Sequence, residues 1–227
     1  MEKKIIYTGI DPEGYLEGES IFHYPLISMK IRSVHSKEIE QAFSKIYAYT
    51  HILFTSKYAV RSFFHAMKEL GVPKEHLDPV FLLAIGRSTL KALESEGVYV
   101  AYVGSDETEE GVIRLLETLD LEDANILLPQ TAVTKPKLIH YLVENLVSYE
   151  VIILYDLVKE RPYYEVNLAD FHKIVFTAPV SVDAFFEIFD DLPPYLEVHA
   201  LGLMTRCRVK YYLDDKMKKI DKKISVC

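Results

Sequence analysis

Two segments of this chain repeat one another, and this repeat constrains the fold more than any other feature. Residues 52–64 read ILFTSKYAVRSFF and residues 174–186 read IVFTAPVSVDAFF, with six identical positions in a gapless alignment. A second shared phrase follows each copy, AIGRST at 84–89 and ALGLMT at 200–205. Two linked phrases in the same order indicate two related α/β lobes rather than one large domain. A pair of lobes offers a cleft, which is a common place for a ligand.

Apolar runs alternate with helical patterns along most of the sequence. Near-continuous apolar runs, typical of parallel strands buried on both faces, predict strands at 3–10, 22–31, 51–56, 81–86, 98–104, 125–130, 149–158, 173–179 and 198–203. Helical patterns predict helices at 57–70, 87–96, 108–119, 135–146, 180–189 and 204–219. This alternation implies parallel, right-handed βαβ units.

The nested order of the repeats predicts a discontinuous first lobe. The long runs at 22–31 and 149–158 flank the first repeat, so we expect them to carry the chain from one lobe to the other and back. Residues 1–24 plus 160–227 would form lobe one, and residues 28–154 lobe two. The predicted fold is α/β, with two similar parallel-sheet lobes of Rossmann or flavodoxin type joined by a two-stranded antiparallel linker. Lobe one is trimmed, because 22 residues follow Thr205.

The starts of the predicted helices carry small polar residues and glycines. We expect side-chain caps at Ser56, Ser88, Thr108, Thr134 and Thr177. The turns after Ser56, Gly86, Thr177 and Gly202 should expose backbone N–H groups and the positive end of a helix dipole. Ligands of doubly wound sheets bind at the carboxyl ends of strands, where these turns lie. The sequence therefore predicts anion binding without a basic motif.

Composition limits the other partners. A formal net charge of −8 disfavours nucleic acid, and no apolar run reaches the length of a membrane span. Cys207 and Cys227 are too few for a disulfide framework, and the eight histidines form no metal-binding pair. No signal-peptide core is recognisable at the N-terminus. We expect a monomeric cytoplasmic protein with neither metal nor membrane contact.

The order of the phrases is similar to that of a known family. The segments LFTSKYAV, AIGRSTLKALESEG, TEEGVIRLL, VIILYDL, VFTAPVSVDAFF and ALGLMT follow one another as in uroporphyrinogen-III synthases, which the chain resembles over nearly its whole length. The resemblance implies two α/β lobes joined by a two-stranded ladder, and no cofactor. It also implies a lyase of haem biosynthesis that closes the linear tetrapyrrole hydroxymethylbilane with loss of water and inversion of ring D.

The resemblance also implies a set of site residues. Tyr155 is the expected catalytic residue, a tyrosine facing the cleft whose hydroxyl assists the leaving water. The expected substrate-binding residues are Thr55, Ser56, Gly86, Ser88, Thr89, Thr108, Gln130, Thr177, Ala178, Ser181, Gly202 and Thr205. Gln130 departs from the arginine of many relatives, and Lys135 or Lys137 would supply a charge there or be solvated. Ala178 stands where serine is common.

Two alternatives stay open. A non-catalytic relative that keeps the two-lobed fold as a ligand-binding or regulatory module is compatible with the trimmed lobe and Gln130. A nucleotide-dependent enzyme on a Rossmann-like fold is disfavoured, because the sequence has no GxGxxG or GxxxxGK[ST] motif. The isomer formed from hydroxymethylbilane separates the enzyme from the module.

Overall fold

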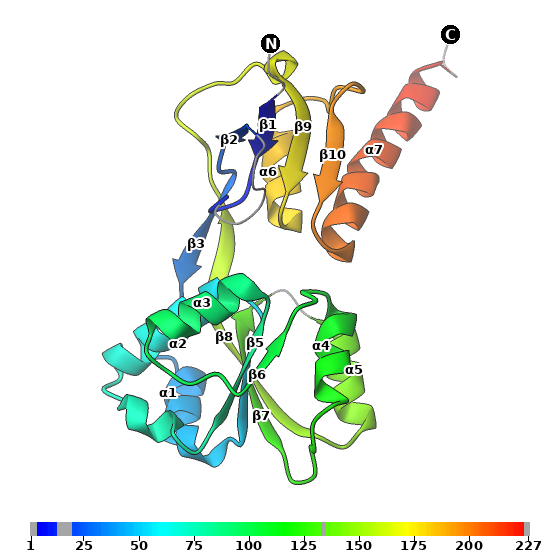
Figure 1. The fold of residues 1–227 in the computed structure, drawn as a ribbon. Helices are drawn as coiled ribbons and strands as arrows, with labels where there is room; N and C mark the ends of the chain where they lie inside the picture. The colour runs from blue at the N-terminus through cyan, green and yellow to red at the C-terminus, as the bar shows by residue number, and fades with distance from the viewer. Residues whose placement is uncertain (1–3, 13–19, 133–134, 225–227) are drawn as a thin grey trace. The chain divides into compact units, whose positions relative to one another are not determined.

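The chain folds into two compact units, each built on its own parallel sheet (Figure 1). The structure is a computed structural model that describes residues 4–12, 20–132 and 135–224, with side chains up to Asp214. Unit 1 comprises Met1–Met29 and Leu157–Cys227, and unit 2 comprises Lys30–Asp156. The first repeat lies in the sheet of unit 2 and the second in the sheet of unit 1.

Unit 1 contains a four-stranded sheet in the order β10-β9-β1-β2. Its strands are β1 (Lys4–Tyr7), β2 (Ile21–His23), β9 (Phe171–Phe176) and β10 (Glu197–Ala200), and all neighbours pair in parallel. The 3₁₀ turn η3 (Leu168–Asp170) precedes β9, α6 (Pro179–Ile188) follows β9, and α7 (Leu203–Ile224) follows β10. Each of these two helices therefore starts at the carboxyl edge of the sheet.

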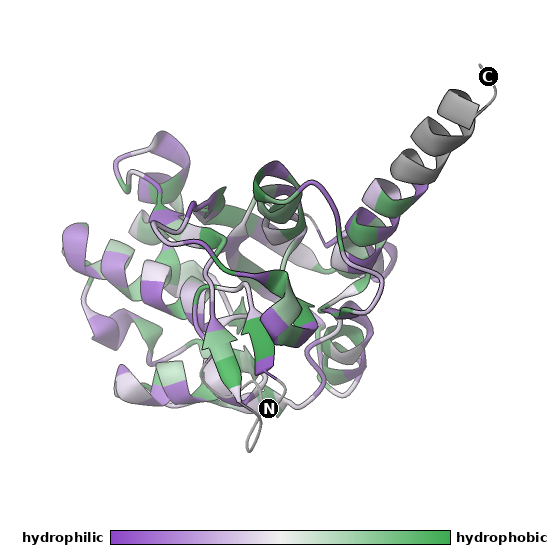
Figure 2. Ribbon diagram, turned by 90° about the horizontal axis from the view of Figure 1, so that it is seen from above, coloured by the Kyte–Doolittle hydropathy of each residue, from purple (hydrophilic) through white to green (hydrophobic). Residues whose placement is uncertain are grey.

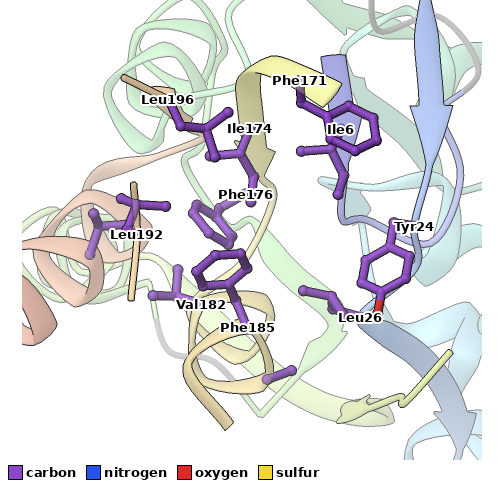
Figure 3. Packing of buried hydrophobic residues seen from close by; sticks show 12 residues of the cluster. Ile6, Tyr24, Leu26, Phe171, Ile174, Phe176, Val182, Phe185, Leu192 and Leu196 are labelled. Atoms are coloured by element: carbon purple, nitrogen blue, oxygen red, sulfur yellow. The ribbon is translucent and has the colours of Figure 1, made fainter. Parts of the chain in front are cut away.

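An aromatic cluster holds α6 against this sheet. Phe176 of β9 and Phe185 of α6 are fully buried, with ring centroids 5.4 Å apart and planes at 81°. Figure 3 shows the two rings beside Val182, Leu192 and the other apolar side chains of the cluster. Burying a side chain of this size stabilises a fold by roughly 1.5–3 kcal/mol. The cluster thus fixes the turn from β9 to α6.

Unit 2 contains a six-stranded sheet in the order β3-β8-β7-β4-β5-β6. The strands are β3 (Ile27–Ile31), β4 (His51–Phe54), β5 (Phe81–Ile85), β6 (Tyr102–Gly104), β7 (Asn125–Thr131) and β8 (Ser148–Lys159). The helices are α1 (Lys37–Ser44), α2 (Lys57–Glu69), α3 (Arg87–Ser95), α4 (Glu109–Leu116) and α5 (Pro136–Glu144), with 3₁₀ turns η1 (Ile46–Ala48) and η2 (Lys74–Leu77). The strands from β8 to β6 pair in parallel.

Helices cover both faces of this sheet. Phe54 of β4 points to the face where Phe63 of α2 and Phe43 of α1 pack, with ring centroids 5.0–5.2 Å apart along this row. Leu53, the preceding residue, belongs instead to the cluster formed with α4 and α5. Successive strand residues therefore bury on opposite faces, which explains the near-continuous apolar runs. The helix ribbons alternate between hydrophilic and hydrophobic residues (Figure 2).

The prediction of a mixed α/β fold with parallel sheets is confirmed, but one predicted strand is wrong. Residues 22–31 form β2 and β3, which belong to different sheets. The N–H groups of Tyr24 and Leu26 donate to the oxygens of Tyr7 and Thr8, and Pro25 between them has no N–H. The chain therefore stays beside the β1 segment up to Leu26 and enters the other sheet at Ile27, where β3 begins.

Helix α1 was not predicted. Ser36 caps it by accepting a hydrogen bond from the Ile39 N–H, and Ile39, Ala42 and Phe43 bury one face of it. The predicted strand at 98–104 is shorter in the structure, where β6 begins at Tyr102. In the part of the chain that the structure describes, no helix is long and apolar enough to cross a membrane.

Candidate functional site

The carboxyl edge of the six-stranded sheet gathers polar residues from several strands. Parallel strands end at one edge of a sheet, so the residues that follow them lie near one another. Thr55 and Ser56 follow β4, and Gly86 follows β5. Gln130 lies near the end of β7, and Tyr155 of β8 is in register with Thr131, the last residue of β7. Most of the predicted site residues of unit 2 thus share one edge.

Tyr155 and Ser56 form a hydroxyl pair at this edge. Their oxygens are 2.9 Å apart, and Ser56 Oγ also accepts a hydrogen bond of 3.1 Å from the Ala59 N–H at the start of α2. Tyr155 is 3% exposed, so its hydroxyl is buried within unit 2 beside Ser56. Burial raises the pKa of Tyr155, and the hydrogen bond with Ser56 opposes this only in part. Tyr155 is therefore neutral over the physiological pH range.

Lys135 brings a positive charge to the same edge. This residue precedes α5, and its Nζ donates a hydrogen bond to Thr55 Oγ1, the side chain next to Ser56. Burial lowers the pKa of Lys135 to about 8, although the charge of Glu109 favours the protonated form. Lys137 instead pairs with Glu110. Of the two lysines considered from the sequence, Lys135 is the one at the strand ends.

A carboxylate lies against the start of α3. Gly86 precedes this helix with a φ of 83° and a ψ of 156°, which only glycine adopts readily. A Cβ atom on Gly86 would collide with the carboxyl group of Glu107, from the loop after β6. The space in front of the helix is therefore occupied by a side chain of the protein itself. Sequence reasoning missed Glu107, because no local pattern places it beside Gly86.

Comparison with known proteins identifies the family. The model of the family described as "Uroporphyrinogen-III synthase HemD" matches residues 15–209. The chain belongs to the uroporphyrinogen-III synthase family. This family comprises lyases of tetrapyrrole biosynthesis that act on a small-molecule substrate. A comparison with curated proteins gave no significant match.

Solved uroporphyrinogen-III synthases share the fold. A structure of a mutant enzyme from Thermus thermophilus aligns with a TM-score of 0.62 and 19% identity, covering 92% of this chain and 89% of that chain. The Helicobacter pylori enzyme aligns with a TM-score of 0.56 and 16% identity, covering 94% of this chain and 89% of that chain. At these identities the likeness establishes the fold, and the site has to be argued from this chain's own residues.

The other predicted site residues of unit 2 differ in how far their side chains are exposed. Thr108 caps α4 by accepting a hydrogen bond of 3.1 Å from the Gly111 N–H. Its own hydroxyl donates to Asp106, and the two hydrogen bonds from Thr108, more than nearby Arg114, hold the pKa of Asp106 below its usual range. Thr89 is 1% exposed and Gln130 is 8% exposed. These two side chains are parts of the packed edge.

Two predicted caps are wrong, and one lies outside the described residues. Helix α3 begins after Gly86, so Ser88 is an exposed residue of its first turn rather than its cap. Helix α6 begins after Ala178, not after Thr177. Ser181 closes that turn, since its Oγ donates to the Ala178 oxygen at 2.7 Å. Thr134 lies outside the described residues.

Unit 1 carries a smaller set of the predicted site residues at the carboxyl edge of its own sheet. Thr177 follows β9 and is half-buried, and a Cβ on Gly9 would approach its Cγ2 to 2.7 Å. The close approach requires glycine at position 9. Gly202 precedes α7 with a φ of 76° and is exposed, whereas Thr205 in the first turn of α7 is 2% exposed. Of the predicted site residues of unit 1, Gly202 and Thr177 are accessible, whereas Ala178, Ser181 and Thr205 are buried.

Proposed function

We propose that this chain is a uroporphyrinogen-III synthase that cyclises hydroxymethylbilane with loss of water and inversion of ring D. The observation that carries the proposal is the match of the family model over residues 15–209. The hydroxyl pair and the ammonium group at one strand edge of unit 2 support it, because they supply hydrogen-bond donors for a departing hydroxyl. No step in this reaction requires a strong nucleophile, since the substrate is activated toward ring closure.

The Tyr155–Ser56 pair is suited to act as a neutral donor. The two hydroxyls hold two protons, and the hydrogen bond between them uses one. The other proton is left for a third group. Because Ser56 is the more exposed member and already accepts from the Ala59 N–H, we assign it the contact with substrate when Tyr155 donates to it. The pair then orients the leaving hydroxyl, and its contribution is modest because burial makes Tyr155 a weak acid.

The carboxylates of the substrate would bind at helix starts. The first turns of α2, α3, α6 and α7 follow strand ends and direct backbone N–H groups outward. At α3 the Glu107 carboxyl has to swing away before a substrate carboxylate can approach Gly86. Ser88→Val and Thr177→Val should weaken product binding and leave the fold nearly intact. Unchanged affinity in both variants would remove these turns from the site.

Several organisational features belong to the same proposal. We take units 1 and 2 as the two domains of the enzyme, with β3 and β8 as the antiparallel linker. Arg32 N–H donates to the Leu154 oxygen and Glu160 N–H to the Leu26 oxygen, which supports opposite strand directions. We expect the enzyme to work as a cytoplasmic monomer without a cofactor. Light scattering on the purified chain measures the oligomeric state.

The decisive experiment is a product-isomer assay. The full-length chain is mixed with freshly prepared hydroxymethylbilane, and the products are oxidised and separated by chromatography. Formation of the type III isomer faster than spontaneous closure supports the enzyme. Only the type I isomer, at the uncatalysed rate, would identify a non-catalytic member of the family.

A further inference from the structure

Lys135 differs from the paired lysines of the protein in what its ammonium group contacts. Lys45, Lys74, Lys137 and Lys159 each form an ion pair with a glutamate. The hydrogen bond from Lys135 goes instead to the neutral hydroxyl of Thr55. A half-buried ammonium group directed at a neutral partner keeps protons available for another acceptor.

Lys135 contacts Thr55, and the next residue in the chain, Ser56, belongs to the hydroxyl pair. Thr55, which accepts from Lys135, and Ser56, which contacts Tyr155, are consecutive residues at the end of β4. Lys135 reaches this turn from the start of α5, which follows β7, the neighbour of β4 in the sheet. Three proton-bearing side chains from three strand ends thus converge on one turn.

We propose that Lys135 is the catalytic residue that gives a proton to the departing hydroxyl group of the substrate. This inference rests on the proposed synthase function. Tyr155 and Ser56 then orient that hydroxyl and are not its source of protons. The proposal replaces the expectation that the Tyr155 hydroxyl assists the departure of water.

The proton transfers balance over one turnover. The C–O bond of the hydroxymethyl group breaks with its electron pair going to oxygen, and a proton from Lys135 Nζ makes water. The electron pair of the pyrrole nitrogen stabilises the resulting carbocation. Attack by the already substituted carbon of ring D forms a carbon–carbon bond and a spiro intermediate, which has no proton to lose at that carbon. The bond from this carbon to its original methylene bridge then breaks and leaves a carbocation stabilised by the neighbouring pyrrole. Re-closure at the free α-carbon of ring D forms the last carbon–carbon bond, and the proton lost there restores aromaticity and returns to the neutral Lys135 amine. The overall change is the loss of one water molecule.

The charges around Lys135 set the pH range of this step. Glu109 of α4 favours the charged ammonium, and on α5 itself the charge of Lys137 is compensated by Glu110. With a pKa of about 8, Lys135 is mostly protonated at pH 7 and transfers its proton more readily than a tyrosine whose pKa is raised by burial. General acid catalysis typically contributes ~10²–10⁴-fold to a rate. The rate of type III formation should therefore fall as pH rises through about 8.

The test compares three variants of the full-length protein in single-turnover assays from pH 6 to 10. Lys135→Met removes the proton and keeps most of the side-chain volume. Lys135→Arg keeps the positive charge but holds its protons too tightly to donate them. Lys137→Met, two residues away and paired with Glu110, is the matched control. We expect a loss of roughly 100-fold in the type III rate for both Lys135 variants and no loss for the control.

Each outcome separates this inference from the proposed function. If the unaltered protein makes no type III isomer, the proposed function fails. If the unaltered protein makes the type III isomer and Lys135→Arg keeps the maximal rate, Lys135 only binds a carboxylate and the inference is wrong. An unaltered pH profile in Lys135→Met would also overturn it. An NMR titration of ¹³C-labelled lysine side chains provides a readout independent of activity, in which one signal should titrate near pH 8 and be absent from Lys135→Met.

Discussion

Replacement of Tyr155 by phenylalanine tests whether the hydroxyl pair exists and what it does. The substitution keeps the buried ring and removes one oxygen, which lies 2.9 Å from Ser56 Oγ. Ser56 keeps its hydrogen bond from the Ala59 N–H, so its oxygen is not left without a partner. The loss is therefore that of one ordinary hydrogen bond, about 1 kcal/mol of unfolding free energy.

The effect of Tyr155→Phe on catalysis should also be small. Burial raises the pKa of Tyr155, so the hydroxyl contributes orientation rather than a proton. We expect the rate of type III formation to fall by at most ~10-fold, which corresponds to roughly 1.4 kcal/mol of barrier. The type III isomer should still predominate, because the rest of the site continues to direct ring closure.

Two assays and one control decide the outcome. Urea unfolding measures the stability difference, and chromatography of the oxidised products measures the rate and the isomer ratio. Tyr99→Phe removes a hydroxyl from a side chain that is 83% exposed and should change neither quantity. If Tyr155→Phe is as stable as the unaltered protein, the hydrogen bond to Ser56 is not made in solution. Complete loss of type III formation would show instead that Tyr155 carries the chemistry.

Three further substitutions test the geometry of each unit. Gly86→Ala should cost about 1–3 kcal/mol of unfolding free energy through backbone strain at a φ of 83° and a ψ of 156°, because the exposed Glu107 side chain can move away from the added Cβ. Gly97→Ala, at a φ of 74° with no atom within 4 Å, should cost no more than that. Phe185→Ala should cost about 3–5 kcal/mol in urea unfolding, since it empties the centre of the unit 1 core; a loss below about 1 kcal/mol would contradict this packing. Burial lowers the pKa of Lys135 from 10.5 to about 8, so between these pH values the unfolded chain binds more protons than the folded protein and the free energy of unfolding rises with pH. Lys135→Met should therefore be more stable than the unaltered protein by up to about 3 kcal/mol below pH 8. This difference in stability should vanish near pH 10.5.

Local patterns in the sequence were sufficient to predict most of the helices and strands and part of the candidate site. The apolar runs marked the strand cores because parallel strands with helices on both faces bury successive residues. Ser56 and Thr108 were recognisable as caps, since a cap needs only its own next three residues. The same locality explains the errors at Ser88 and Thr177, where a shift of one or two residues in the helix start changes which side chain reaches the backbone.

The contacts that make the site depend on the order of the strands and so on the tertiary structure. Tyr155 meets Ser56 across 99 residues of sequence, and Lys135 meets Thr55 across 80. These residues, far apart in the sequence, come into contact because β8, β7 and β4 are adjacent in the sheet. No short segment of the sequence specifies this order of strands. The sequence by itself determined the α/β class, the repeat and the family resemblance, all of which are written in local patterns. The tertiary structure decided that Tyr155 is buried and that Lys135 has a lowered pKa, because burial and charge are properties of the packed neighbours.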